Sequence, residues 1–438
     1  MTASDRVTVV GAGLAGCEAA WQLARRGIAV TLVEMKPAKR TPAHSMEGFA
    51  ELVCSNSLRA NALTNACGLL KEEMRRLDSL ILRAADENKI PAGGALAVDR
   101  DGFSAAITGA LRTHPLIEIR MEEALSLPEP PAIVATGPLT SDALAAAIAA
   151  RFHTLCFYDA AAPIVTLDSI DMRRVFRASR YGKGGDDYLN CPMTKDEYFA
   201  FYEALINART APVHGFEETS VFEGCMPVES MARRGPMALA FGPLKPVGLV
   251  DPATNRRPFA NVQLRQDDAA ATLYNLVGFQ TRLAFGEQRR VFGMIPGLEN
   301  AEFARYGVMH RNTFLQSPGI LSATFEVLET PGLYFAGQIT GVEGYVESAA
   351  SGLVAGLSLA RQLHGLPAFP FPTTTALGAL GRHVSSPNRA YQPMNITFGL
   401  IDDYPETIRN KAARYEAISR RALGVLDQCK GAFEFEWN

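Results

Sequence analysis

Three glycines near the start of the sequence have the spacing needed to bind the phosphates of a dinucleotide. The stretch Gly11-Ala12-Gly13-Leu14-Ala15-Gly16 follows an apolar run and precedes a helical pattern. In such a turn the first glycine permits a tight bend, the second lets the backbone approach a pyrophosphate, and the third lets helix and strand pack closely. Glu34 ends the next apolar run, about 20 residues further on, where a carboxylate can accept hydrogen bonds from a ribose. The spacing predicts a dinucleotide site, with an ordinary strand-to-helix turn as the alternative.

Two cysteines lie in loops where a thiol could do covalent chemistry. Cys54 precedes Ser55-Asn56-Ser57, a run of polar side chains that could meet a ligand. A buried structural cysteine is the alternative there, because cysteine is among the most buried residue types. Cys225 lies between Gly224 and Met226, in a turn with a glutamate on either side. A thiol on a loop is more accessible than one on an apolar face, but nearby acids disfavour its thiolate unless arginines or a phosphate offset them.

Strands and glycine loops from both ends of the sequence are expected to position these residues. Strands are predicted at 6–10 and 28–33 with a helix between them, and a further helix at 68–88. A buried strand ends at Ala135-Thr136-Gly137, which either returns the chain beside a flavin cofactor or is a simple strand exit. Another strand runs into Gly337 and Gln338, and a small-residue helix begins just after Gly344 and Tyr345. The N-terminus of that helix can stabilise negative charge on a reduced flavin.

The sequence predicts an α/β protein in which one Rossmann-like FAD-binding domain, of the glutathione-reductase type, is interrupted by an insertion. The FAD-binding domain is expected at 1–154 and 301–438, and a mixed α/β insertion facing the substrate at 155–300. Thr194 and Glu197 form a capping box that opens a helix in the insertion. Arginines in this domain could contact RNA phosphates, although a solvated surface is the usual role of such groups. They are Arg173, Arg174, Arg177, Arg233, Arg234, Arg256 and Arg257.

The composition is that of an ordinary globular enzyme. The chain has 438 residues, 47% of them hydrophobic and 20% charged, which is ample for two or three domains. It contains no apolar run of about 18 residues and no signal pattern, so we expect a cytoplasmic protein. Its seven scattered cysteines indicate neither a disulfide framework nor a metal site. The net charge of −3 requires any RNA-binding surface to be a local patch.

Four segments together closely resemble one family, the folate- and FAD-dependent tRNA (uracil-5-)-methyltransferases called TrmFO. The segments are Val9–Ala20, Cys54–Arg59, Phe222–Glu229 and Phe335–Ser348, and the resemblance runs nearly end to end. The last segment is also similar to MnmG, a relative that modifies the wobble uridine of tRNA. MnmG is much longer and carries a C-terminal helical extension for its partner. Because this chain stops at Asn438 without one, we expect the TrmFO type.

The TrmFO resemblance implies a particular reaction and set of ligands. Members methylate carbon 5 of the uridine at position 54 in the T-loop of tRNA. The carbon comes from 5,10-methylenetetrahydrofolate by way of FAD, with NADPH or NADH as reductant. Uracil carbon 5 is a poor nucleophile until a thiolate adds to carbon 6, and a base must later remove the carbon 5 proton. Cys225 and Cys54 match the family's cysteines, Cys225 as nucleophile and Cys54 as general base or assisting thiol, with the order of roles open. No obligate protein partner is expected.

Three other functions fit parts of the sequence. An NAD(P)H-dependent flavin oxidoreductase acting on a small molecule would need neither the arginine groups nor two loop cysteines. An RNA-binding flavoprotein with structural FAD would keep its role without Cys54 and Cys225. An MnmG-like wobble-uridine enzyme would need a partner GTPase.

Overall fold

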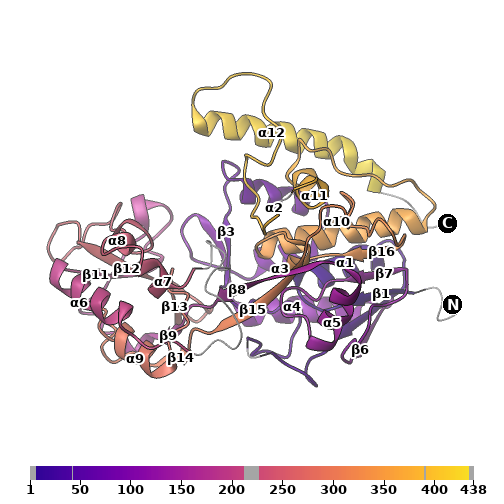
Figure 1. Ribbon diagram of the computed structural model, residues 1–438. Coiled ribbons are helices and arrows are strands. Elements are labelled where there is room, and N and C mark those ends of the chain that lie inside the picture. The colour runs from indigo at the N-terminus through magenta and orange to yellow at the C-terminus, as the bar shows by residue number, and fades with distance from the viewer. Residues whose placement is uncertain (1–5, 42, 212–225, 389–390, 434–438) are drawn as a thin grey trace.

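The chain folds into two lobes. It passes from the larger lobe into the smaller one and back again through one pair of strands. The computed structural model describes residues 6–41, 43–211, 226–388 and 391–433, with the backbone alone at 155–159 and 309–311. The larger lobe contains both the N-terminal and the C-terminal segments, and the smaller lobe contains the middle of the chain (Figure 1). The linking strands are β8 (Thr154–Ala160) and β15 (Met309–Leu315), which pair antiparallel. Cys225 lies outside the described residues.

A five-stranded parallel sheet forms the centre of the larger lobe. Its strand order places β1 in the middle, with β2 on one side and β7 on the other. Because ligands of such sheets bind at the carboxyl ends of the strands, the turn that follows β1 lies at the expected place. Apolar side chains in these strands are buried on both faces. In order across the sheet, the strands are β16 (Leu333–Phe335), β7 (Ala132–Val134), β1 (Val7–Val10), β2 (Val30–Glu34) and β6 (Ile117–Met121).

Helices cover this sheet, and two of them pack with unusually close backbones. A Cβ on Gly352 would lie 2.1 Å from the carbonyl oxygen of Ala15, so helix α10 rests directly on α1. The small residues of the helix predicted after Tyr345 therefore allow a close helix–helix contact. The helices of the larger lobe are α1 (Leu14–Ala24), α2 (Ala66–Arg76), α3 (Leu80–Glu87), α4 (Arg100–Thr113), α5 (Asp142–Arg151), α10 (Tyr345–Leu363), α11 (Ala376–Ser385) and α12 (Lys411–Cys429).

The single helix predicted at 68–88 is wrong, because the chain breaks it between α2 and α3. Asp78 adopts a left-handed conformation with φ of 56°. Ser79 then begins a new helix by accepting a hydrogen bond from the Leu82 amide at 3.2 Å. A small sheet lies beside these helices, in the order β3 (Ser57–Ala60), β5 (Ala95–Val98) and β4 (Lys89–Ile90).

The smaller lobe has its own antiparallel sheet and its own hydrophobic core. The predicted capping box is confirmed, since Thr194 and Glu197 bond reciprocally at the start of α6. In order across the sheet, the strands are β10 (Phe176–Arg177), β11 (Tyr188–Met193), β12 (Ala260–Gln266), β13 (Leu273–Leu276), β9 (Ile164–Thr166) and β14 (Phe303–Arg305). The helices are α6 (Lys195–Ile206), α7 (Val228–Ala232), α8 (Ala238–Phe241) and α9 (Phe285–Phe292).

Four short 3-10 turns complete the described structure, η2 (Leu167–Ser169), η3 (Arg180–Gly182), η5 (Gln338–Thr340) and η6 (Lys430–Phe433). No helix in the described ranges combines the length and apolar character needed to cross a bilayer. The division of the chain at 154/155 and 300/301 stays a prediction. The antiparallel sheet of the smaller lobe spans residues 164 to 305.

Candidate functional site

The glycine turn after β1 is shaped by contacts that differ from one glycine to the next. Gly11 has φ of 99°, and a Cβ there would lie 2.7 Å from the carbonyl oxygen of Ala135. A Cβ on Gly16 would lie 1.8 Å from the carbonyl oxygen of Gly11. Both positions must be glycine for the protein to fold this way. A Cβ on Gly13, in contrast, would meet no described protein atom within 4 Å. Gly13 therefore leaves open the space at the N-terminus of α1 in which a phosphate group would lie.

Glu34 is held in a fixed orientation at the mouth of this turn. The amide of Ala12 donates to one carboxylate oxygen at 2.8 Å, and the amide of Lys36 donates to the other at 3.0 Å. An ionised carboxylate has further lone pairs and can still accept from a ribose hydroxyl. A cavity of about 80 Å³ opens beside it. Its lining includes Gly11, Gly13, Val33, Glu34, Met35, His44, Thr136 and Ser141.

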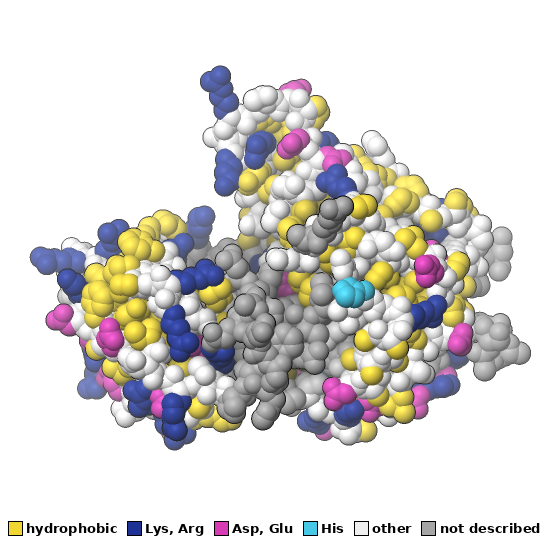
Figure 2. Space-filling model, viewed as in Figure 1, with side chains coloured by type: hydrophobic (Ala, Val, Ile, Leu, Met, Phe, Trp, Pro, Cys, Tyr) yellow, Lys and Arg dark blue, Asp and Glu magenta, His cyan; other side chains and the backbone are white. Residues whose placement is uncertain are grey.

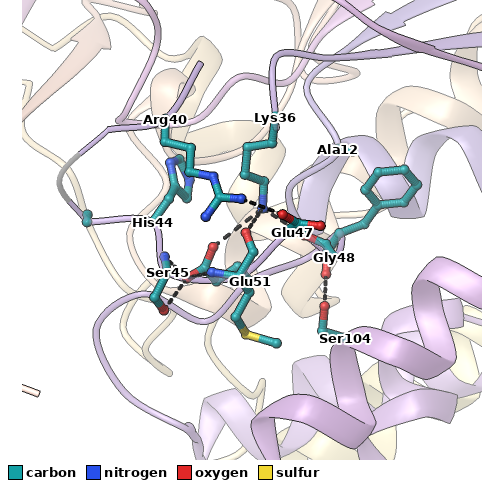
Figure 3. Close-up of polar contacts among 12 residues, drawn as sticks. Ala12, Lys36, Arg40, His44, Ser45, Glu47, Gly48, Glu51 and Ser104 are labelled. Carbon is teal, nitrogen blue, oxygen red and sulfur yellow. Dashed lines mark hydrogen bonds and ion pairs between the residues drawn. The ribbon is translucent and has the colours of Figure 1, made fainter. Parts of the chain in front are cut away.

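The loop after β2 folds around a buried ion pair (Figure 3). Lys36 lies 3.4 Å from the carboxylate of Glu51, and their side chains are only 4% and 3% exposed. The amide and hydroxyl of Ser45 donate to Glu51 at 2.7 and 2.9 Å. Burial acts to raise the pKa of Glu51, but the Ser45 hydrogen bonds and the Lys36 charge outweigh it, and the pKa is lowered. The amide of Ala50 donates to the carbonyl of Ala12 at 2.9 Å, which attaches this loop to the glycine turn.

The two glycine loops from opposite ends of the chain meet at this site. Gly337 has φ of 86°, and a Cβ there would lie 3.2 Å from the Cβ of Ala15 in the first turn. Its amide donates to the Ser351 hydroxyl of α10 at 2.7 Å. Gln338 donates to the carboxylate of Glu343 at 2.6 Å, which holds the second loop in shape. The two glycine loops therefore lie against each other, and their binding of one cofactor stays a prediction.

The remaining residues predicted to bind the cofactor lie in the turn after β7 and at the start of α10. The amide of Ala135 donates to the carbonyl of Val10 at 2.8 Å, which places the Ala135–Gly137 turn against the glycine turn. The hydroxyls of Thr136 and Thr140 share a hydrogen bond of 2.7 Å. Gly344, with φ of 105°, immediately precedes α10. The Ala135–Gly137 turn directly follows β7, and Gly337 lies just after β16, so both are at the carboxyl edge of the parallel sheet.

Cys54 lies against the first residue of α10. The amides of Cys54 and Ser55 both donate to the Tyr345 hydroxyl, at 2.7 and 3.2 Å. The Cys54 sulfur lies 3.8 Å from the carbonyl oxygen of Ala160, at the end of the linking strand β8. Burial, with a further contribution from Cys54, raises the pKa of Tyr345 above its ordinary value, so its hydroxyl stays protonated. The Cys54 loop is thus fixed by a residue that the sequence assigned to the cofactor.

Two arginines that sequence reasoning missed surround the Cys54 loop. Arg265, on β12 of the smaller lobe, donates to the Ser55 hydroxyl at 2.7 Å and to Asn56 Oδ1 at 2.9 Å. Arg100, at the start of α4, pairs with Asp267 at 2.9 Å. Arg100 also donates to the carbonyl of Leu52, so both guanidinium groups contact the loop that carries Cys54. Cations beside a thiol stabilise negative charge on it.

The alternation of polar residues along β12 was the available signal for Arg265. Asn261, Gln263 and Arg265 occupy every second position of β12, and the apolar residues Ala260, Val262 and Leu264 alternate with them. Such a pattern places three polar side chains on one face of a sheet. The buried pair of Lys36 and Glu51 gave no comparable pattern, because both lie in a loop.

The predicted RNA-binding arginines separate into two groups. Arg173, Arg174, Arg256 and Arg257 line one cavity of about 540 Å³ in the smaller lobe. The other three do not line it. Arg177 lies on the edge strand β10, within 3.4 Å of the Tyr274 hydroxyl. Arg233 and Arg234 follow α7 and are exposed.

The fold and the site define a protein with a two-segment, Rossmann-like dinucleotide-binding lobe and an inserted second lobe. GidA from Aquifex aeolicus has this fold, with a TM-score of 0.68 at 16% identity, over 99% of this chain and 76% of that one. The family described as Glucose inhibited division protein A matches residues 6–367.

Closer relatives identify the family within that class. Two proteins named Methylenetetrahydrofolate--tRNA-(uracil-5-)-methyltransferase TrmFO match nearly the whole chain. The one from Desulfitobacterium hafniense (strain Y51) is 60% identical over 430 residues, and the one from Enterococcus faecalis (strain ATCC 700802 / V583) is 58% identical over 429. Each alignment covers 97% of this chain and 98% of the relative. The chain belongs to the TrmFO family, as its motifs predicted.

Proposed function

We propose that this protein transfers a one-carbon unit from methylenetetrahydrofolate to carbon 5 of a uracil in tRNA. The TrmFO relatives are named for this reaction and match the chain over 97% of its length. The observation in the structure that supports it best is the position of Cys54. Its loop is held between Tyr345 of the dinucleotide-binding lobe and, through Ser55, Arg265 of the inserted lobe. A thiol at that junction can meet a substrate bound to one lobe and a cofactor bound to the other.

FAD fits the glycine loops of the larger lobe. We propose that Gly11–Gly16 bind its pyrophosphate, and that Glu34 accepts from its ribose. Gly13 supports this placement because a Cβ there would point into open space rather than into protein. Ala135–Gly137, Gly337, Gln338, Gly344 and Tyr345 would contact the rest of the cofactor. When bound, FAD would supply the carbon-transfer and reduction chemistry of the reaction.

The cysteines would do the covalent chemistry on the uracil. We propose that Cys225 adds to carbon 6 and so makes carbon 5 nucleophilic. Cys54 would then take the carbon 5 proton or assist as a thiol. Arg265 and Arg100 would stabilise a Cys54 thiolate, which is the form that accepts a proton.

The finer features of the reaction are proposed with it. The target is the uridine at position 54 in the T-loop, which must leave its stack at a cost of a few kcal/mol. Contacts from the predicted arginines to RNA phosphates would offset that cost. The reductant is NADPH or NADH, and the protein acts in the cytoplasm without an obligate protein partner.

The test is transfer of labelled carbon to tRNA. Purified FAD-loaded protein is incubated with unmodified tRNA transcript, carbon-labelled methylenetetrahydrofolate and NADPH, and label in 5-methyluridine is counted. Wild type is expected to transfer label, while Cys225→Ala and Cys54→Ala are not. Cys429→Ala is the matched control, because it removes a partly exposed thiol at the end of α12 and should keep full activity.

Each failure has a separate meaning. Absence of label with the folded, yellow wild-type protein would refute the methyltransferase. Label with Cys225→Ala but not with Cys54→Ala would move the covalent role to Cys54. Replacing NADPH by NADH in the same assay identifies the preferred reductant.

A further inference from the structure

The smaller lobe contains a cavity, called the insertion cavity here, that the proposed chemistry at Cys54 does not use. It has a volume of about 540 Å³, within the range of ligand-binding cavities. Its walls combine aromatic and proline side chains with charged groups. Lining residues include Arg174, Phe176, Met193, Thr194, Arg256, Arg257, Pro258 and Phe259.

The insertion cavity carries a net positive charge, and some of its arginines form no ion pair within the described residues. Four arginines line it against two carboxylates, Glu197 and Asp251. Glu197 is bound to Arg174, at 2.6 Å. Asp251 accepts hydrogen bonds within its own turn. Arg256 and Arg257 are exposed and form no ion pair with any residue in the described ranges. These two side chains are available to an anion.

The aromatic lining gives the insertion cavity a second chemical character. Phe176 and Phe259 are both only partly buried. Phe259 is held from behind by Tyr198, with ring centroids 5.3 Å apart. A partly exposed ring on a firm support is a stacking surface for a base. Arginines beside such rings fit a nucleotide, whose base is flat and whose phosphate is anionic.

Strand β12 sets the distance between the insertion cavity and Cys54. Its first residue, Ala260, follows the cavity-lining Phe259 and pairs with Met193. Arg265, near its other end, bonds to the Cys54 loop. Five residues of strand correspond to about 17 Å. A distance of this size spans several stacked nucleotides. One RNA arm can reach both places.

We propose that the insertion cavity binds an unstacked nucleotide of the tRNA, away from the target uridine. Arg256 and Arg257 contact its phosphate groups, and its base lies against the aromatic lining formed by Phe176 and Phe259. The basic side chains on the smaller lobe in Figure 2 are consistent with an RNA-facing surface there. This inference rests on the proposed function, since it takes tRNA as the substrate. It adds a second anchoring point that selects RNA by shape and charge.

The test removes the two uncommitted charges. Arg256→Gln/Arg257→Gln is expected to raise the KM for tRNA about tenfold and leave kcat unchanged, because the cavity is remote from Cys54. The slope of log Kd for tRNA against log salt should become shallower by about 1.5, since each lost phosphate contact contributes 0.7 to 0.9. Phe176→Leu should raise the same KM about fivefold without changing the slope, because stacking carries no charge.

The matched control is Arg289→Gln/Arg290→Gln, which removes two charges from α9 outside the cavity. It should change the KM for tRNA less than twofold. An equal effect of both pairs, an unchanged tRNA KM in the cavity pair, or a raised KM for methylenetetrahydrofolate instead would overturn the proposal. Absence of methylation by wild type would refute the proposed function alone, because tRNA binding and its salt slope are measured without turnover.

Discussion

The glycine turn makes a prediction in which two similar substitutions have opposite consequences. Gly13→Ala should leave the protein folded but weaken FAD binding, whereas Gly16→Ala should disrupt the fold itself. A Cβ on Gly13 meets no described protein atom within 4 Å, while one on Gly16 lies 1.8 Å from the carbonyl oxygen of Gly11. The two glycines are three residues apart, so the comparison separates cofactor contact from protein packing.

The magnitudes follow from that geometry. Gly13 has φ of −77°, which alanine adopts without strain, and it is the N-cap of α1. Alanine caps a helix less well than glycine, so the apoprotein should lose only about 0.5–1 kcal/mol. A methyl group pressed against bound pyrophosphate should cost about 1–3 kcal/mol, or about 5- to 150-fold in the Kd for FAD. Gly16→Ala should cost the apoprotein at least about 3 kcal/mol.

Both quantities can be measured on protein stripped of FAD. Urea unfolding followed by circular dichroism gives the stability of the apoprotein, and quenching of flavin fluorescence gives the Kd. A Gly13→Ala protein that is folded and binds FAD as tightly as wild type would show that the pyrophosphate does not lie at this turn. A Gly16→Ala apoprotein as stable as wild type would refute the packing argument.

Three further substitutions test the packing and the charges. Arg265→Met should lower kcat at least tenfold by loosening the Cys54 loop, and kcat measures this. It should change the free energy of unfolding by less than about 2 kcal/mol in urea unfolding, because the loss of a donor to buried Asn56 is partly offset by removal of a buried charge. Burial raises the pKa of Glu73 from its ordinary value of 4.5 to about 7. The stability that the protonated side chain contributes is therefore fully present below pH 4.5 and is lost as the pH rises through 7. Urea unfolding at pH 5.5 and pH 8 should show this loss in wild type and not in Glu73→Gln. Gly352→Val should destabilise the protein by at least about 3 kcal/mol by forcing α10 away from Ala15, whereas Gly424→Ala, with open space around it, should not; thermal melts compare them.

The dinucleotide-binding lobe was predictable because its signals are local. Gly11, Gly16 and Glu34 lie within one strand–turn–helix–strand unit, where spacing in sequence fixes spacing in structure. The second loop at Gly337 was also predictable, because it again has an apolar strand, a glycine-rich turn and a helix in succession. The error at 68–88 arose where a left-handed Asp78 interrupts an otherwise continuous helical pattern.

The surroundings of Cys54 could not be predicted in the same way, because they come from segments far apart in sequence. Ser55 and Arg265 are 210 residues apart, and Cys54 and Tyr345 are 291 apart. No spacing rule relates such positions, since only the folded chain brings them together. The sequence identified Cys54 as a candidate from its type and its loop, but not the cations beside it. The grouping of Arg256 with Arg173 around one cavity depends on the same long-range pairing of strands.

The hydrogen bonds of β12 suggest why the second lobe is inserted into the first rather than attached at an end. The chain leaves the larger lobe along β8 and returns to it along β15, and these two strands pair. The sheet of the smaller lobe therefore has two covalent connections to the larger lobe. Arg265 adds a third, non-covalent connection at the Cys54 loop. Two connections restrict rotation more than one, and a thiol must be placed within a few tenths of an ångström to react. If the smaller lobe holds the RNA, as proposed above, these connections would present it at a fixed angle to Cys54 and to the glycine loops beyond it.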